Sequence, residues 1–170
     1  MSNRIFNRLV LFIFLILFQG LILNKIAIAG FVTPYFYIMF IFLLPFEIKH
    51  WQLVLCGFFL GLFVDMFTGY LGVQAFSCML LGFLRPYLIK WISGLKTFEG
   101  TTCPCIADLG WGWFFGYTFL GTLIFQSSLV LIETFNFHNF SKSIVEVLLN
   151  TLLAVFLFMA YQYIFVPSKR

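Results

Sequence analysis

The fold is decided by residues 51–91, which read WQLVLCGFFLGLFVDMFTGYLGVQAFSCMLLGFLRPYLIKW. Two apolar runs, 51–68 and 71–91, flank a short turn that contains Gly69 and Gly72. A transmembrane helix needs about 20 mainly apolar residues to cross about 30 Å of hydrocarbon. Because each run has about that length, the stretch predicts a hairpin of two membrane-spanning helices.

The composition extends this prediction to the whole chain. Of its 170 residues, 62% are hydrophobic and 9% are charged, and the mean hydropathy is +1.04. An ordinary soluble domain is about 45–50% apolar and about 25% charged, so a water-soluble globule is excluded. The net charge of +4 comes without any basic run. We therefore expect lipid and other helices around most side chains, and no nucleic-acid partner.

Four more apolar segments complete the predicted architecture. We expect an all-α integral membrane protein, a six-transmembrane-helix bundle forming a single domain, with spans at 5–23, 31–47, 51–68, 71–91, 109–132 and 144–166. The segment 31–47 is short and contains Pro34 and Pro45. An alternative for 5–23 is a signal peptide, since residues 27–30 (AIAG) resemble a small-residue cleavage site. The length of that apolar run favours a retained span.

The charges and aromatic residues at the span ends predict the orientation. Lys and Arg collect on the cytoplasmic side of membrane proteins. If both termini are cytoplasmic, eight basic residues lie inside, and only Lys25 and Lys142 lie outside. The inner set is Arg4, Arg8, Lys49, Arg85, Lys90, Lys96, Lys169 and Arg170. Aromatic residues that fit an interfacial belt are Trp51, Tyr70, Trp91, Trp111, Tyr161 and Tyr163.

The third span carries an acidic residue beside two glycines. Gly57, Gly61 and Asp65 follow at intervals of four and therefore share one helix face. Such glycines allow a neighbouring backbone to approach closely, and a carboxylate within a span is a functional hypothesis by default. Asp65 either accepts hydrogen bonds from helix amides or pairs with a cation at that contact, or it is an interfacial cap next to the turn. Both interpretations make Asp65 structural rather than catalytic.

Arg85 is the cation nearest in sequence, but its depth differs from that of Asp65. Arg85 lies about 21 Å below the start of the fourth span, and Asp65 lies about 5 Å from the same membrane face. We therefore expect no ion pair between them. Near the inner interface Arg85 can extend its charge to water or contact the phosphate of membrane lipids. Pro86 is expected to kink or end the helix.

The fifth span repeats the small-residue spacing and contains polar residues. Gly112 and Gly116 predict a second close helix contact, within the bundle or with a partner protein. Gln126, Ser127 and Ser128 form a polar notch. We expect them to form hydrogen bonds between helices.

Few residues offer any chemistry. Cys103-Pro104-Cys105 is a weak candidate for a soft metal such as copper(I), but two free thiols in a reducing cytoplasmic loop are favoured. The chain lacks a Walker motif, His-Glu-x-x-His, Gly-x-Ser-x-Gly and paired carboxylates, which are signatures of common catalytic sites. We expect no enzymatic activity and no cofactor.

The joint order of these features resembles a known family. In sequence the features are Pro34, Pro45, 57–65 (GFFLGLFVD), 72–75 (GVQA) and 84–86 (LRP). This order, the chain length and the six predicted spans resemble the rod shape-determining protein MreD family. The most specific part is 61–65 with Gly72 seven residues later. Residues 33–35 (TPY) and 132–135 (IETF) make the chain most similar to members from Bacteroidota.

The resemblance implies a function and a location. The family is a non-enzymatic component of the cell-elongation machinery in the bacterial inner (cytoplasmic) membrane, where it works with MreC, the actin-like MreB, the polymerase RodA and a class B penicillin-binding protein. In fold it resembles the substrate-binding subunits of energy-coupling-factor vitamin transporters. The first hypothesis is thus a membrane scaffold that uses the Gly57, Gly61 and Asp65 face for essential packing, with Gly72 as a further residue of helix packing or partner contact. The alternative is a vitamin-binding subunit of a transporter, which would need a polar cavity.

Overall fold

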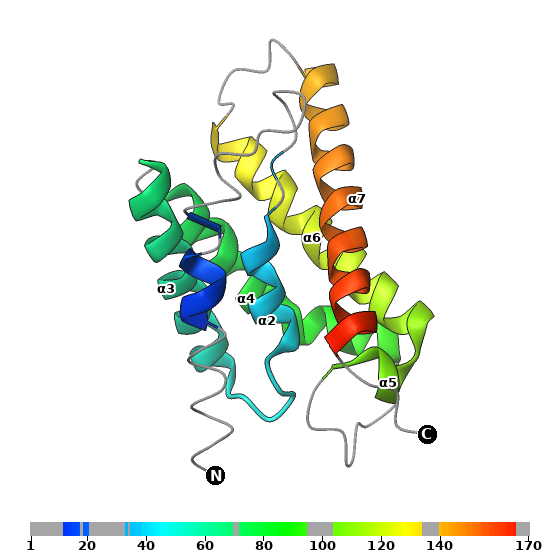
Figure 1. Ribbon diagram of the computed structural model, residues 1–170. Helices are drawn as coiled ribbons and strands as arrows, with labels where there is room; N and C mark the ends of the chain where they lie inside the picture. The colour runs from blue at the N-terminus through cyan, green and yellow to red at the C-terminus, as the bar shows by residue number, and fades with distance from the viewer. Residues whose placement is uncertain are drawn as a thin grey trace.

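A computed structural model describes residues 12–17, 19–20, 33, 35–69, 72–94, 104–133 and 140–165. Within these residues the chain is helical and contains no strand. The elements are η2 (Phe36–Ile38), α2 (Met39–Leu43), α3 (His50–Thr68), α4 (Val73–Ser93), α5 (Ile106–Leu109), α6 (Trp111–Glu133) and α7 (Phe140–Phe165). Residues 12–17 and 19–20 are also helical. Figure 1 shows α2 between α3 and α7, in front of α4, and α4 packs directly against α6.

Four of the described helices, α3, α4, α6 and α7, are long and apolar enough to cross a membrane. They overlap the predicted spans 51–68, 71–91, 109–132 and 144–166, so the expected helical fold and four helices of membrane-spanning length and hydropathy are confirmed. Successive long helices run in opposite directions (Figure 1). Most of the predicted span 5–23 and the alternative cleavage site at 27–30 lie outside the described residues.

The segment 31–47 does not form a spanning helix in its described part. Here η2 has 3 residues and α2 has 5, and α2 stops at Leu43, with Leu44 extended before Pro45. Helix of that length covers only about 12 Å. Its side chains are buried on every side, including Tyr37, Ile38, Met39, Phe40, Ile41 and Phe42. A short apolar run is typical of a core helix rather than of a span, and α2 is the centre of the bundle.

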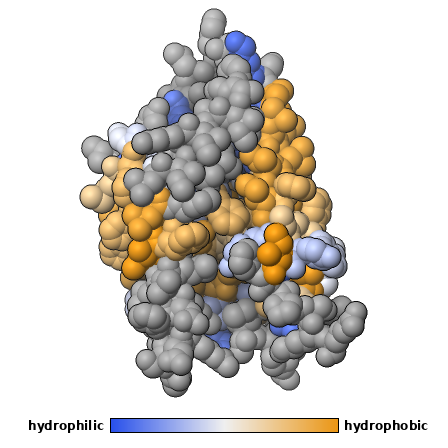
Figure 2. Space-filling view, viewed as in Figure 1, coloured by the Kyte–Doolittle hydropathy of each residue, from blue (hydrophilic) through white to orange (hydrophobic). Residues whose placement is uncertain are grey.

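Large apolar side chains are exposed on the outside of the bundle, among them many on α3 and α7. Figure 2 shows hydrophobic residues along both flanks of the visible face, where these helices lie in Figure 1. The exposed residues include Leu55, Phe58, Phe59, Phe63, Met66 and Phe67 on α3 and Val145, Leu148, Leu149, Leu152 and Phe156 on α7. Such exposure is unfavourable in water and favourable against acyl chains.

Exposed aromatic residues mark one end of the bundle. The starts of α3 and α6 and the ends of α4 and α7 lie at the same end (Figure 1). Trp51, Trp91, Trp111 and Tyr163 are all exposed there. Amphipathic rings prefer the membrane–water interface, so these four residues fit the predicted belt. Of the other predicted members, Tyr161 is partly buried against the core, and Tyr70 lies outside the described residues.

Candidate functional site: the α3–α4 hairpin and its buried charges

Glycines allow α3 and α4 to touch backbone to backbone. A Cβ atom built on Gly57 would lie 2.9 Å from the carbonyl carbon of Cys78, and one on Gly61 would lie 2.5 Å from the Cα atom of Ala75. From the other helix, Gly82 faces the backbone of Leu53, 2.7 Å from its carbonyl oxygen. Real Cβ contacts do not occur below 3.0 Å. The close approach that the four-residue spacing predicts is therefore present, and α4 itself occupies this face.

The turn between the two helices depends on two glycines with positive φ. Gly69 ends α3 with φ 76° and donates its N–H to the carbonyl of Asp65 at 3.0 Å. Gly72 precedes α4 with φ 95°. L-residues other than glycine rarely adopt this region. A Cβ atom on Gly72 would meet nothing within 4 Å, so Gly72 shapes the turn and does not pack against another helix as predicted.

Asp65 caps α4 from the preceding helix. Its carboxylate is 1% exposed and accepts three backbone hydrogen bonds, from Gly72 at 3.1 Å, Gln74 at 3.2 Å and Ala75 at 2.9 Å. The first N–H groups of a helix have no partner within the helix, and their partial positive charge attracts an anion. The structure thus decides for the amide-capping interpretation of Asp65 over pairing with a cation.

A hydrogen-bonded chain connects this cap to the core. Gln74, in the first turn of α4, donates from Nε2 to the Thr68 hydroxyl at 3.4 Å. Its Oε1 accepts a 2.6 Å bond from the hydroxyl of Tyr37, which is fully buried in η2. Polar groups within a bilayer must find partners inside the protein. This series of hydrogen bonds therefore fixes η2 against the α3–α4 hairpin.

Arg85 is buried in the middle of the bundle. Only 1% of the residue is exposed. Its Nε donates to the hydroxyl of Tyr117 at 2.7 Å, and its Nη2 donates to the carbonyls of Phe42, at 3.5 Å, and Leu44. These carbonyls belong to the C-terminal end of α2, where the last carbonyl groups lack helical partners. Arg85 thus holds α2 in the bundle and connects it to α6.

This position corrects the predicted roles of Arg85 and Pro86. Arg85 neither extends to water nor reaches lipid phosphate, because α2 and α6 enclose it. A buried guanidinium requires hydrogen-bond acceptors, and α2 supplies them through backbone atoms that sequence spacing does not reveal. Pro86 does not end the helix, since α4 continues to Ser93.

The two buried charges have separate partners. The bonds of Asp65 go to the start of α4, and those of Arg85 go to the end of α2 and to Tyr117. No hydrogen bond joins Asp65 to Arg85, in agreement with the predicted difference in depth. Each charge is stabilised by the helix terminus of opposite partial charge. This arrangement holds helices together and offers no acid–base pair.

The glycines of α6 behave differently from those of α3. Cβ atoms built on Gly112 and Gly116 would meet nothing within 4 Å, whereas one on Gly121 would meet the ring of Phe42. The contact within the bundle that their spacing predicts is absent among the described residues. Gly112 is exposed and Gly116 is partly exposed. The predicted contact with a partner stays a prediction.

The polar residues of α6 and α7 are only partly satisfied. Ser128 donates to the carbonyl of Phe125 at 2.8 Å, within its own helix. In contrast, four buried side chains have polar atoms without a hydrogen-bond partner in the part of the chain that the structure describes: Thr122, Gln126, Thr151 and Gln162. Ser127 is partly buried. The predicted notch thus exists, but the expected bonds between helices are absent at Gln126 Nε2.

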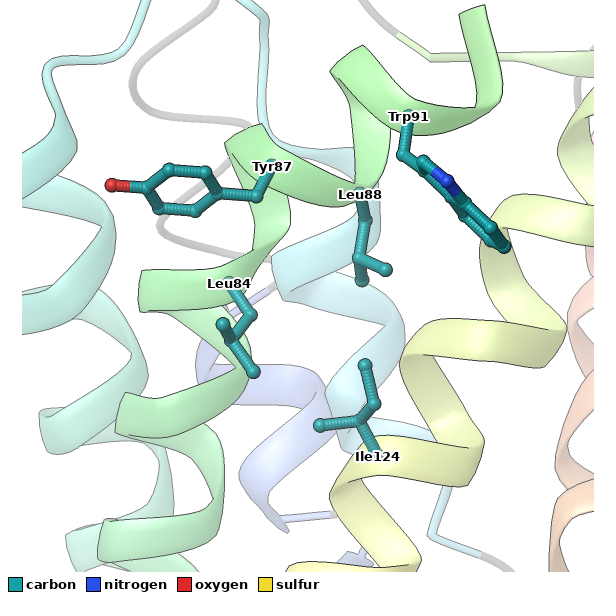
Figure 3. A pocket seen from close by; sticks show the side chains of 5 residues that line it. All are labelled: Leu84, Tyr87, Leu88, Trp91 and Ile124. Carbon is teal, nitrogen blue, oxygen red and sulfur yellow. The ribbon is translucent and has the colours of Figure 1, made fainter.

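An apolar groove of about 330 Å³ lies between α4 and α6. It is lined by Leu84, Tyr87, Leu88 and Trp91 of α4 and by Ile124 of α6. Figure 3 shows Leu84 and Leu88 of α4 on the side of Ile124 of α6, with Trp91 pointing toward α6 and Tyr87 pointing away from it. Because Tyr87 and Trp91 are exposed, the groove opens to the outside of the bundle.

The cysteine candidate is only partly described. Cys105 precedes α5 and donates a weak thiol hydrogen bond to Asp108 at 3.7 Å. Cys103 lies outside the described residues. Groups of three or more His, Cys, Asp or Glu side chains that could hold a metal are absent from the residues that the structure covers. The weak copper(I) site stays untested.

Comparisons with protein-family models, curated proteins and solved structures found no match for this chain. The site is therefore interpreted from its own geometry. Sequence reasoning identified Gly57, Gly61, Asp65 and Arg85 but missed Tyr37, Gln74 and Tyr117. A polar or hydroxyl-bearing residue inside an apolar run was the available signal for these three, since buried polar groups need partners.

Proposed function

We propose that this protein is a non-enzymatic membrane scaffold of the bacterial cell-elongation machinery. It resides in the inner membrane with both termini in the cytoplasm and binds an MreC-like protein, and through it MreB, RodA and a class B penicillin-binding protein. The resemblance to the MreD family is the basis for these partners. The proposal needs a rigid membrane body and a surface for a partner helix.

One observation carries the proposal. The residues that make the resemblance specific all stabilise one hairpin or attach it to α2. They are Gly57, Gly61, Asp65, Gly72 and Arg85. Asp65 and Arg85 have hydrogen-bond partners inside the protein and are almost completely buried. Because these residues serve the packing of the protein's own helices, they support a scaffold better than they support an enzyme.

The contact surface has to be sought away from that hairpin interface, because α4 already covers Gly57 and Gly61. We propose the edge of α6 at Gly112 and Gly116 for a transmembrane helix of the MreC-like partner. A Cβ atom built on either glycine would meet nothing within 4 Å among the described residues, and small residues at this spacing allow two helices to pack closely in lipid. The exposed Trp111 and Phe115 flank this edge.

The experiment compares leucine substitutions at matched glycines. Gly116→Leu and Gly112→Leu should leave the yield and melting temperature of the detergent-purified protein unchanged, because the added side chains meet open space. The same variants should lose at least tenfold in recovery of a co-expressed MreC-like protein. Gly61→Leu should instead lose the folded protein itself.

Two results would contradict the proposal. Undiminished recovery of the partner by both α6 variants would reject the contact surface. Normal rod shape in cells that lack the protein altogether would reject the role in elongation. Complementation of that deletion by the wild-type chain is the control for the second measurement.

A further inference from the structure

The groove between α4 and α6 leads from one end of the bundle toward its middle. Its lining consists of three aliphatic side chains, Leu84, Leu88 and Ile124, and two aromatic ones, Tyr87 and Trp91. Seven residues separate Leu84 from Trp91, so the groove extends about 10 Å along α4. Trp91 belongs to the exposed aromatic residues that mark one end of the bundle. The groove therefore begins at the predicted membrane interface and continues into the apolar part of the bundle.

A positive charge without a partner lies at this opening. Lys90 directly precedes Trp91 and is a neighbour of Tyr87 on the helix surface, three residues away. Lys90 is exposed and forms no hydrogen bond or ion pair with the described part of the chain. The described acidic residues at this end are Glu47, between α2 and α3, and Asp108 of α5, and neither forms an ion pair with Lys90. The groove thus combines an apolar interior with a free cation at its entrance.

The start of α3 brings further basic residues to the other side of Tyr87. Figure 3 shows that Tyr87 points away from α6. Its ring lies 6.0 Å from that of His50, which also lies 5.0 Å from the ring of Phe83. The exposed Lys49 directly precedes His50. Basic residues from two helices therefore lie near the entrance of the groove.

We propose that the groove binds one anionic phospholipid, with an acyl chain against Leu84, Leu88 and Ile124 and the phosphate group beside Lys90. Four described helices are long and apolar enough to cross a membrane, and in a bilayer an outward apolar groove meets acyl chains. The free cation decides the headgroup, because a zwitterionic headgroup carries its own positive group, whereas a headgroup with a net negative charge attracts a nearby lysine. A lysine at a helix end can extend its ammonium group to that level. The site does not depend on the proposed function.

Native mass spectrometry of the full-length protein in detergent tests the headgroup. The probes are phosphatidylglycerol and phosphatidylcholine with identical acyl chains, and the measurement is the dissociation constant of the first bound lipid. We expect phosphatidylglycerol to bind about fivefold more tightly, which is the contribution of one lysine near a membrane surface. Lys90→Gln should remove most of this preference. Lys142→Gln is the matched control, because Lys142 is also exposed but lies at the opposite end of the bundle, and it should retain the preference.

Filling the groove tests the place of the acyl chain. Leu88→Trp should weaken the binding of both lipids by about tenfold, because the added ring takes the space of several methylene groups. Leu152→Trp, at an exposed position of α7, is the control and should leave both dissociation constants unchanged. If Leu88→Trp fails to fold, Ile124→Phe fills the same groove from α6.

Four outcomes would overturn the proposal. Equal affinities for the two lipids would reject the anionic headgroup, and a preference that survives Lys90→Gln would reject the role of that lysine. Binding that is unaffected by Leu88→Trp or Ile124→Phe would place the lipid outside the groove. Disulfide cross-linking of Leu88→Cys to a co-expressed membrane protein, without lipid binding, would assign the groove to a helix of that protein.

Discussion

The α3–α4 pair and the α6–α7 pair are both antiparallel helix pairs inside the same bundle, but they are held together in different ways. Between α3 and α4, three glycines bring the backbones into contact, and every acceptor of Asp65 is matched to an amide. On α6 and α7, Gly112 and Gly116 have no such role, and buried threonine and glutamine atoms lack hydrogen-bond partners among the described residues. The carboxylate of the first pair thus has its hydrogen bonds inside the protein, whereas several polar atoms on the helices of the second pair have none there.

The largest expected effect is at Gly61. Replacing it by leucine places side-chain atoms into the backbone of Ala75, and overpacking of this kind costs about 3 kcal/mol or more when backbone must move. We expect loss of the monodisperse peak in size-exclusion chromatography. Gly112→Leu, in open space, is the matched control. Equal peaks for both variants would remove the distinction between the two helix pairs.

The second largest loss of stability is expected for substitutions of Asp65, because its carboxylate accepts hydrogen bonds from three backbone amides. Asp65→Leu leaves these donors unpaired and should destabilise the protein by about 2–3 kcal/mol. Asp65→Asn keeps one acceptor oxygen and should lose about half as much. Thermal unfolding in detergent measures both. If leucine proves as stable as aspartate, the capping role of Asp65 is wrong.

Arg85 and Tyr117 test the attachment of α2. Arg85→Met removes the donors to Phe42 and Leu44 and should cost about 2 kcal/mol, since hydrogen bonds to charged groups are the stronger ones. Tyr117→Phe removes one of the partners and should cost about 1 kcal/mol. Protease accessibility of the 44–49 segment measures the release of α2. Unchanged protection in Arg85→Met would contradict this attachment.

The smallest expected effect has the opposite sign and belongs to α7. Both polar atoms of Gln162 lack partners within the described residues, and Gln162→Leu should raise stability by about 1 kcal/mol, because an unpaired buried amide is removed. The melting temperature in detergent is the measurement, with Thr118→Val as the near-neutral control. A fall in stability would contradict this prediction and would mean that the Gln162 side chain has a hydrogen-bond partner.

The spacing of Gly57, Gly61 and Asp65 was enough to predict a close backbone contact on one face of α3, because helix geometry places residues four apart on one face, but it did not reveal that α4 makes this contact. The role of Arg85 was not predictable in this way. Counting along α4 gives its depth but does not reveal that the carbonyls of α2 lie beside it. Gly112 and Gly116 show the same limit of sequence reasoning. Two glycines four residues apart form a buried helix contact in α3, but the same spacing in α6 forms no contact within the described bundle.

The apolar composition of residues 31–47 predicts a membrane span, although the segment is short and contains Pro34 and Pro45. Their described helical part was instead buried by other helices, because an apolar side chain is equally stable in a packed core. The lack of charges does not distinguish a lipid-exposed helix from one that is buried in the protein core. The length of the helix does distinguish them, and the prolines that shorten this segment were the signal for a core element.

The burial of α2 has a consequence for biogenesis. The segment is made before α4, α6 and α7, yet these later helices supply the Arg85 side chain, the Tyr117 hydroxyl and the ring of Phe158 that enclose it. The contacts around α2 therefore cannot form until nearly the whole chain has left the ribosome. Insertion into the bilayer and final folding are therefore separated in time, and nascent chains stalled before residue 140 should remain accessible to quality-control proteases.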